Sequence, residues 1–201
     1  MKLLTLYDNK AKGKFRAGWG FSCLIKWKCT ILFDTGADVE ILSHNARLFG
    51  IDKDEIKYCF ISHLHGDHTG GLGWLKEVKV FRPGEYDGSI KGVTTLVFKH
   101  PLEQALMFED ERIMIVGCSH PGIVRMAERA YERYGKLKLI IGGMHLLDLS
   151  EVEVIQIANR LKELTELIAP CHCTGDKAIE TFNSVFKERF VENYAGNKIE
   201  I

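Results

Sequence analysis

The order of apolar segments in this chain of 201 residues predicts an α/β (α+β) fold. We expect two mixed sheets packed face to face, with helices on both outer faces. Short apolar or alternating runs, typical of strands, dominate the first half. After residue 122, longer runs with helical spacing alternate with short apolar runs, which indicates strand–helix units. No linker or internal repeat interrupts the chain, so we expect a single domain over residues 1–201.

The first half is expected to contain most of the strands. Apolar or alternating runs predict strands at residues 3–7, 21–27, 29–33, 58–62, 78–81, 93–98, 105–108 and 112–116. Helical spacing predicts a helix over 38–48, ended by Gly50, and a short helix over 72–76. The acidic residues 109–111 are expected to form a hairpin turn.

The second half is expected to add three helices, over 122–134, 150–168 and 177–190. Ser150 and Glu153 have the spacing of a capping box at the start of the second of these helices. Short strands are expected at 137–141, 168–171 and 198–201, and the last of them can close a sheet edge.

The composition disfavours several classes of partner. Lys plus Arg and Asp plus Glu number 27 each, and a net charge of zero weighs against binding to nucleic acid or to a membrane surface. No apolar run approaches the ~20 residues that a membrane span needs, and the N-terminus does not look like a signal peptide. We therefore expect a cytoplasmic protein whose six cysteines are reduced.

One short segment has an unusual concentration of metal-binding side chains. His63, His65, Asp67 and His68 fall within six residues, directly after the apolar run 58–61. A packed strand end has no structural need for three imidazoles, and a solvated loop is more often built from Ser, Asn or Lys. Imidazole and carboxylate groups gathered at one point are what a transition-metal ion binds.

This segment resembles the His-x-His-x-Asp-His motif of the metallo-β-lactamase superfamily. Residues 30–36, which include Asp34, are similar to the strand and Asp-x-Gly element that precedes the motif. The segments around His120, His145 and His172 resemble one branch of the superfamily. That branch includes the dihydropterin–ribofuranosylaminobenzene phosphate synthase and related metal-dependent hydrolases. The resemblance implies the αββα sandwich of this family, with the strand-end histidines along one rim.

The resemblance implies two divalent metal ions, with zinc expected and iron or manganese as alternatives. His63 and His65 are expected to hold the first ion. Asp67 and His68 are expected to hold the second, and Asp67 is also counted among the catalytic residues. Two such ions lower the pKa of a bridging water and stabilise the charge that develops on a substrate. The glycines at 66, 70 and 71 are expected to let the backbone turn sharply around the ions.

The remaining ligands are expected after two later strands, with His120 on the first ion and His172 on the second. Many superfamily members carry an aspartate that bridges the two ions, whereas this chain has Gly-Cys-Ser-His at residues 117–120. Either Cys118 or His120 fills that space, or the second ion is held weakly. If His120 fills it, His100 is the remaining candidate for the first ion.

Two further side chains are expected to act in the site without binding metal. Asp34 is expected to orient the histidine segment from behind the site. His145 is expected to contact the substrate or to transfer a proton, because a histidine near its ordinary pKa of ~6.5 can protonate a leaving oxygen. The structural alternative for His145 is a hydrogen bond to a loop carbonyl.

Three cysteines lie beside the expected ligands. Cys118 is expected to support the ligands as a neighbour of the site. Alternation along an extended segment predicts that Cys171 and Cys173 point away from His172, so neither is expected to be a ligand.

These expectations favour a metal-dependent hydrolase that acts on an ester or phosphoester of a small anionic molecule. The alternative is a transferase similar to the synthase that joins a pterin to an arylamine phosphate. A nucleic-acid-processing or metal-binding module ranks third, because the net charge is zero and the chain has no room for an added domain. The sequence carries no signal for an oligomeric state.

Overall fold

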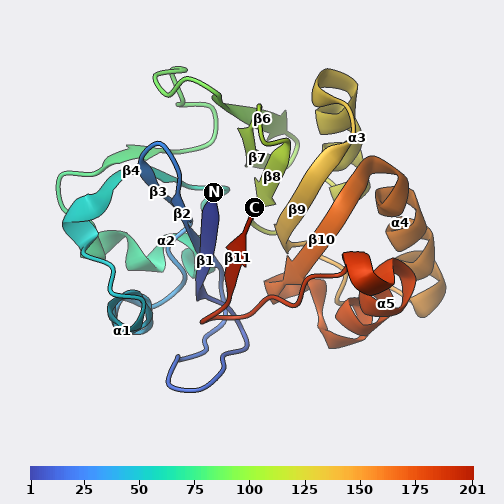
Figure 1. The fold of residues 1–201 in the computed structure, drawn as a ribbon, viewed down its shortest axis with the longest axis horizontal. Coiled ribbons are helices and arrows are strands. Elements are labelled where there is room, and N and C mark those ends of the chain that lie inside the picture. Colours follow the sequence, from blue (N-terminus) through green and yellow to red (C-terminus); the bar gives the residue numbers. More distant parts are fainter. The chain divides into compact units, whose positions relative to one another are not determined.

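A computed structural model describes residues 1–201, which form two compact units. Unit 1 comprises residues 1–85 and 193–201, and unit 2 comprises residues 86–192. Each unit contains one mixed sheet with its own helices (Figure 1). The predicted fold class, with two mixed sheets, is confirmed. The single domain over 1–201 stays a prediction.

The sheet of unit 1 has six strands in the order β11-β1-β2-β3-β4-β5. Their bounds are β1 Lys2–Tyr7, β2 Ser22–Lys26, β3 Thr30–Phe33, β4 Ile56–Phe60, β5 Lys79–Phe81 and β11 Lys198–Glu200. β11 pairs with β1 at the sheet edge, as predicted, so the first and last strands of the chain lie side by side (Figure 1). β3 and β4 are parallel with Phe33 opposite Phe60, and the residues that follow both strands therefore meet at one end of the sheet.

Two α-helices belong to unit 1, α1 Val39–Leu48 and the short α2 Gly66–Thr69. Asp38 caps α1, because its side chain accepts hydrogen bonds from the first backbone N–H groups of that helix. Leu42 and Ala46 bury one face of α1 against the sheet. The predicted helix over 72–76 is wrong: Gly70–Trp74 form a 3-10 turn, and the three glycines in that turn disfavour an α-helix.

The sheet of unit 2 has five strands in the order β10-β9-β8-β7-β6. Their bounds are β6 Val93–Lys99, β7 Leu102–Phe108, β8 Ile113–Val116, β9 Leu137–Gly143 and β10 Thr165–Cys171. β8, β9 and β10 are parallel, with Val116 and Pro170 both opposite Gly142, so their carboxyl ends lie at one edge. β7 is antiparallel to β8, and the start of β7 therefore lies beside the end of β8.

Three helices pack on the sheet of unit 2 (Figure 1): α3 Ile123–Tyr134, α4 Glu151–Leu164 and α5 Asp176–Phe186. The predicted capping box of Ser150 and Glu153 is confirmed. The predicted helix over 150–168 is four residues too long at its C-terminal end. Its apolar spacing continues to Ile168, but residues 165–171 pair with β9, and this pairing overrides the helical pattern. The predicted helix over 177–190 likewise ends early, at Phe186.

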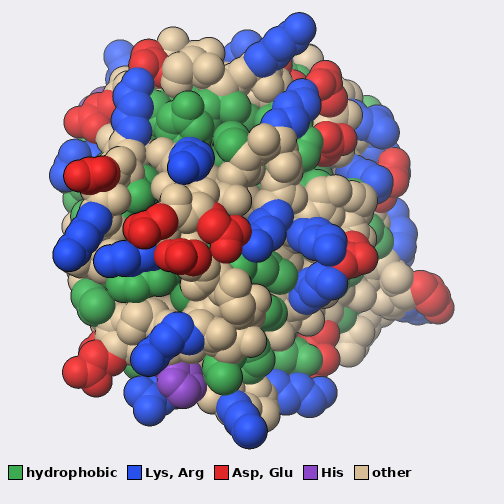
Figure 2. Space-filling view, turned by 60° about the vertical axis from the view of Figure 1, so that its left-hand side comes forward, with side chains coloured by type: hydrophobic (Ala, Val, Ile, Leu, Met, Phe, Trp, Pro, Cys, Tyr) green, Lys and Arg blue, Asp and Glu red, His purple; other side chains and the backbone are tan.

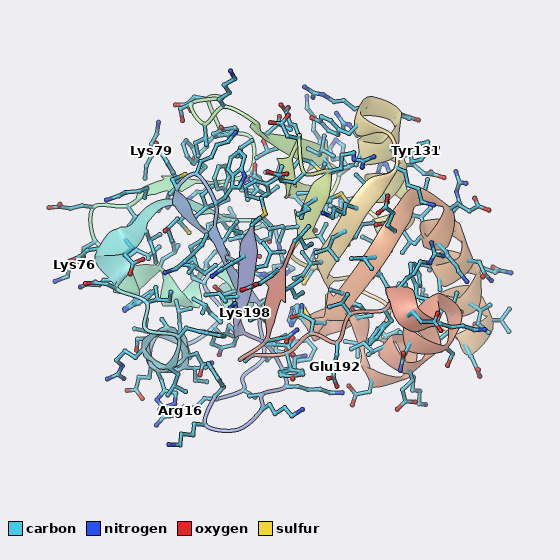
Figure 3. The ribbon with its side chains drawn as sticks, in the orientation of Figure 1. Arg16, Lys76, Lys79, Tyr131, Glu192 and Lys198 are labelled. Atoms are coloured by element: carbon cyan, nitrogen blue, oxygen red, sulfur yellow. The ribbon has the colours of Figure 1, made fainter.

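The surface carries charges of both signs. Lys and Arg side chains lie beside Asp and Glu side chains on the face drawn in Figure 2. Exposed cations such as Lys76 and Lys79 extend outward from unit 1 (Figure 3). None of the helices combines the length and the apolar character that crossing a membrane requires.

The buried face of α4 should determine the stability of unit 2. Leu161 is completely buried in the core of that unit, whereas Ile155 on the same helix is 37% exposed. We expect Leu161→Ala to lower the free energy of unfolding by about 2–5 kcal/mol, because it leaves a cavity. Ile155→Ala is the control and should change it by about 0.5 kcal/mol or less. Urea unfolding followed by circular dichroism measures both values, and equal effects would contradict this account of the core.

Candidate metal centre

The histidine loop, residues 62–68, follows β4 in unit 1 and passes close to the segment after β3. A Cβ atom on Gly70 would lie 2.1 Å from the carbonyl oxygen of Ala37, and one on Gly71 would lie 2.2 Å from that of Thr35. Neither glycine has a positive φ, and neither does Gly66. The expectation that these glycines allow a sharp turn is therefore wrong. Gly70 and Gly71 are needed because two backbone segments touch there.

Asp34 is completely buried at the end of β3 and collects three hydrogen bonds from the histidine loop. Its Oδ1 accepts from the backbone N–H of Ser62 at 2.7 Å. Its Oδ2 accepts from the Ser62 hydroxyl and from Nδ1 of His68, both at 2.7 Å. Burial raises the pKa of the Asp34 carboxyl, while His68 and the Ser62 donors favour the ionised form and oppose that rise.

These bonds determine which nitrogen of two histidines carries a hydrogen. Because Oδ2 of Asp34 accepts from His68, the hydrogen of that ring is on Nδ1 and the lone pair is on Nε2. The Ser62 hydroxyl gives its hydrogen to Asp34, so at 2.9 Å it accepts from Nδ1 of His63. His63 therefore also presents the lone pair of Nε2.

The side-chain atoms of unit 1 that could bind a metal ion form two pairs. Nε2 of His63 lies 3.0 Å from Nδ1 of His65, and Nε2 of His68 lies 3.5 Å from Oδ2 of Asp67. Two ligands on one tetrahedral zinc ion, at bond lengths of ~2.0–2.2 Å, are roughly 3.3 Å apart. The chemistry and the spacing of each pair therefore fit a divalent metal ion, and the predicted division of the four residues between two ions stays a prediction.

Unit 2 contains a buried carboxylate that the sequence did not indicate. Glu103, on β7, is completely buried and accepts hydrogen bonds from the segment after β8. Its Oε1 accepts from the backbone N–H groups of Cys118 at 3.2 Å and Ser119 at 2.7 Å. Its Oε2 accepts from both the backbone N–H and Nδ1 of His120, each at 2.9 Å. The lone pair of His120 is therefore on Nε2.

Strand pairing explains why Glu103 meets this segment. β7 runs antiparallel to β8 with Leu106 opposite Ile115, so extending the register brings residue 103 opposite residue 118. The predicted strand began at residue 105, two residues after Glu103. In the sequence, Glu103 could have been noticed only as an acidic side chain at the border of an apolar run. An exposed loop residue produces the same pattern.

His172 follows β10 and is 4% exposed. Its Nε2 lies 3.3 Å from Sγ of Cys118. Residues 172–174 form a 3-10 turn rather than an extended segment. A Cβ on Gly143 would meet both Sγ of Cys173, at 2.7 Å, and Cδ2 of His172, at 3.2 Å. The prediction that Cys173 points away from His172 is therefore wrong.

His145 follows β9, is exposed and has a φ of 52°. Its ring centroid lies 4.5 Å from that of His120. A hydrogen bond with Cys173 raises the pKa of His145. The hydrogen bond from Cys118 and then that with His145 lower the pKa of Cys173 to about 5, although burial opposes this. His145 is thus favoured in its protonated form.

Each unit therefore gathers its own share of the predicted site residues. In unit 1 these are His63, His65, Asp67 and His68, with Asp34 beneath them. In unit 2 they are His120, His145, His172 and Cys118, joined by Glu103 and Cys173. His100 is exposed in the turn between β6 and β7.

Comparisons with known proteins show which proteins the chain resembles. Residues 24–103 match the family model described as "Metallo-beta-lactamase superfamily". The 7,8-dihydropterin-6-methyl-4-(beta-D-ribofuranosyl)-aminobenzene-5'-phosphate synthase of Methanocaldococcus jannaschii is 27% identical over 283 residues, which cover 100% of this chain and 96% of that protein.

Solved structures that match the whole chain include the following two. Tm1679, described as a metal-dependent hydrolase of the β-lactamase superfamily, has 27% identity and a TM-score of 0.82, and the match covers 100% of this chain and 99% of that one. Human tRNase Z, short form, has 14% identity and a TM-score of 0.62, with the same coverage of both chains, and shows similarity of fold alone.

Loss of the Glu103 carboxylate should affect unit 2 as strongly as loss of a metal ligand would. In Glu103→Gln an amide NH₂ group replaces one carboxylate oxygen and faces N–H donors, so hydrogen bonds to a buried charge are lost. We expect a loss of unfolding free energy of about 2 kcal/mol or more and metal affinity that is weaker by about 10–100-fold. Urea unfolding and a competitive zinc titration measure these. Glu132→Gln, at an exposed site on α3, is the control; a Glu103 variant that matched it would refute this role.

Proposed function

We propose that the chain is a member of the metallo-β-lactamase superfamily and a metal-dependent hydrolase that cleaves an ester or phosphoester of a small anionic molecule. The observation that carries this proposal is the hydrogen bonding of Asp34 and Ser62, which turns the lone pairs of His63 and His68 away from the buried carboxylate. A purely structural cluster has no need for two histidines in one enforced tautomer.

The proposed ligands follow the two donor pairs of unit 1. In unit 1, His63 and His65 are the proposed ligands of the first ion, and Asp67 and His68 are those of the second. In unit 2, His120 and His172 are the proposed ligands. Histidine and carboxylate donors suit zinc, with iron and manganese as alternatives. Such ions, when bound, supply a water of lowered pKa and positive charge opposite the oxygen that becomes negative during hydrolysis.

The protein side chains divide the remaining work in this proposal. Asp34 and Glu103 hold the ligand histidines in position, and Asp67 acts as both a ligand and an acceptor of hydrogen bonds beside the reacting water. His145 is the proton donor to the leaving oxygen, because its exposed ring is favoured in the protonated form by Cys173. When protonated, this imidazole also attracts an anionic substrate.

We assign the enzyme to the cytoplasm in this proposal. The six cysteines are all thiols rather than disulfides, which suits a reducing compartment. Cys171 and Cys173 lie only two residues apart beside a proposed ligand, where an oxidising compartment would expose the site to disulfide exchange.

A second candidate is a transferase that catalyses the reaction of the synthase from Methanocaldococcus jannaschii. The observation in its favour is the similarity to that synthase along the whole chain. Incubation with a pterin diphosphate and an arylamine phosphate, followed by chromatography of the products, separates the two candidates. A joined pterin–arylamine product supports the synthase, and hydrolysis of phosphoesters without such a product supports the hydrolase.

Removal of one loop histidine should abolish hydrolysis. We expect His68→Ala to lower kcat/KM on model phosphodiesters or esters by more than about 100-fold, since loss of an outer hydrogen-bond partner alone changes activity by about 10–100-fold. Chelation of the metal should have the same effect on the unaltered protein. His44→Ala is the matched control, because His44 lies on α1 and contacts the carbonyl of Lys14. Full activity in the His68 variant after chelation would overturn the proposal.

A further inference from the structure

The loop between β1 and β2 in unit 1 carries a run of positive charge that no acidic side chain balances. Its residues 10–16, which we call the basic loop, contain four cations and no acidic residue. Lys12, Lys14 and Arg16 are exposed, and none of the three forms an ion pair. The ammonium group of Lys12 instead lies 5.6 Å from the centre of the Tyr194 ring. Cations held this close repel one another, so a bound anion would stabilise the loop.

The basic loop is held firmly against α1, where Figure 3 shows Arg16. Asn45 on α1 is completely buried, and its Oδ1 accepts from the backbone N–H of Arg16 at 2.8 Å. Its Nδ2 donates to the carbonyl oxygens of Arg16 and Leu6, both at 2.8 Å. The ring of Phe15 packs on that of Phe49, with the ring centroids 4.7 Å apart. A loop anchored in this way loses less freedom on binding a ligand, unlike a charged segment that is only solvated.

The basic loop leaves the sheet at the same end as the histidine loop. β1 and β3 are both antiparallel to β2, so they run in the same direction, and β4 is parallel to β3. The chain after the basic loop touches the histidine loop directly, because the N–H of Phe21 donates to the carbonyl oxygen of Asp67 at 3.4 Å. A Cβ on Gly20 would lie 2.3 Å from the same oxygen. The four Cα–Cα steps from Arg16 to Gly20 span at most about 14 Å. A small molecule can therefore reach both loops.

We propose that the basic loop binds a second phosphate group of the substrate, which is therefore a small molecule with at least two phosphates. This inference rests on the proposed metal-dependent hydrolysis and names the class of substrate for it. One phosphoester is cleaved at the histidine loop, while Arg16 and Lys14 bind the other phosphate and leave it unchanged. The guanidinium group of Arg16 can donate to two phosphate oxygens at once, and the ammonium group of Lys14 adds a point charge.

The size of the basic loop favours a small molecule over a nucleic acid. A nucleic acid is held by many phosphate contacts along its backbone. The basic loop offers four exposed cations within seven residues, which suits one phosphate group.

Titration of the metal-free full-length protein with inorganic diphosphate tests the site without relying on activity. We expect the backbone N–H signals of residues 12–16 to shift in proton–nitrogen NMR spectra until they saturate. The double variant Arg16→Gln/Lys14→Gln should bind diphosphate at least about 10-fold more weakly, because two charged hydrogen-bond donors are lost. The matched control is Lys28→Gln/Lys57→Gln, since both lysines are exposed in unit 1 outside the basic loop. It should bind diphosphate as the unaltered protein does.

Inhibition of the zinc-loaded protein tests whether one molecule occupies both loops. Alkane-α,ω-bisphosphonates of increasing length are compared with alkylphosphonates of the same length during hydrolysis of a model phosphodiester. We expect the best bisphosphonate to have an inhibition constant at least about 10-fold lower than that of the matching alkylphosphonate. The Arg16/Lys14 double variant should lose this advantage, and the Lys28/Lys57 control should keep it. Removal of zinc by the inhibitor would affect both variants equally.

The other outcomes contradict the inference in different ways. Unchanged signals of residues 12–16 overturn it, and hydrolysis of the model phosphodiester by the same protein then leaves the proposed hydrolase intact. Shifted signals without any advantage of the bisphosphonates assign the bound anion to a molecule other than the substrate. Equal weakening in the Lys28/Lys57 control indicates non-specific attraction to surface cations. Absence of hydrolysis by the metal-loaded protein overturns the proposed function, and with it the assignment of the basic loop to a substrate.

Discussion

The buried carboxylate of Asp34 is the constraint on which the histidine loop depends. An anion withdrawn from water is stable only where hydrogen-bond donors surround it. Ser62 and His68 supply those donors, and the parallel pairing of β3 with β4 brings Ser62 within reach. The hydrogen bonds that stabilise the Asp34 carboxylate therefore also orient the imidazole of His68 and, through Ser62, that of His63. Stability and ligand geometry thus have one physical cause.

Unit 2 meets a similar requirement with a different residue. Glu103 lies on β7, which is antiparallel to β8, and its carboxylate accepts hydrogen bonds from the segment that carries His120. A histidine held in one tautomer and one orientation has less freedom to lose when it binds a metal ion. Each unit thus pre-organises nitrogen donors before any ligand arrives.

Local patterns predicted much of this molecule. The density of histidines at 63–68 indicated a candidate metal-binding loop, and the spacing of Ser150 and Glu153 predicted the start of α4. Features that depend on pairing between distant segments were not predictable in this way. Glu103 looked like a loop residue because only the register of β7 with β8 buries it. The predicted direction of the Cys173 side chain was wrong because the chain after β10 forms a 3-10 turn. The alternation expected of an extended segment does not apply in such a turn.

The tautomers of the site histidines in the metal-free protein show whether the buried carboxylates orient these side chains. Long-range proton–nitrogen NMR spectra of isotope-labelled protein distinguish an imidazole protonated at Nδ1 from one protonated at Nε2. We expect His63, His68 and His120 in the Nδ1–H form, because Asp34, Ser62 and Glu103 accept at those positions. The Nε2–H form at His68 or His120 would contradict the account, since the buried carboxylates would then not be directing the donors.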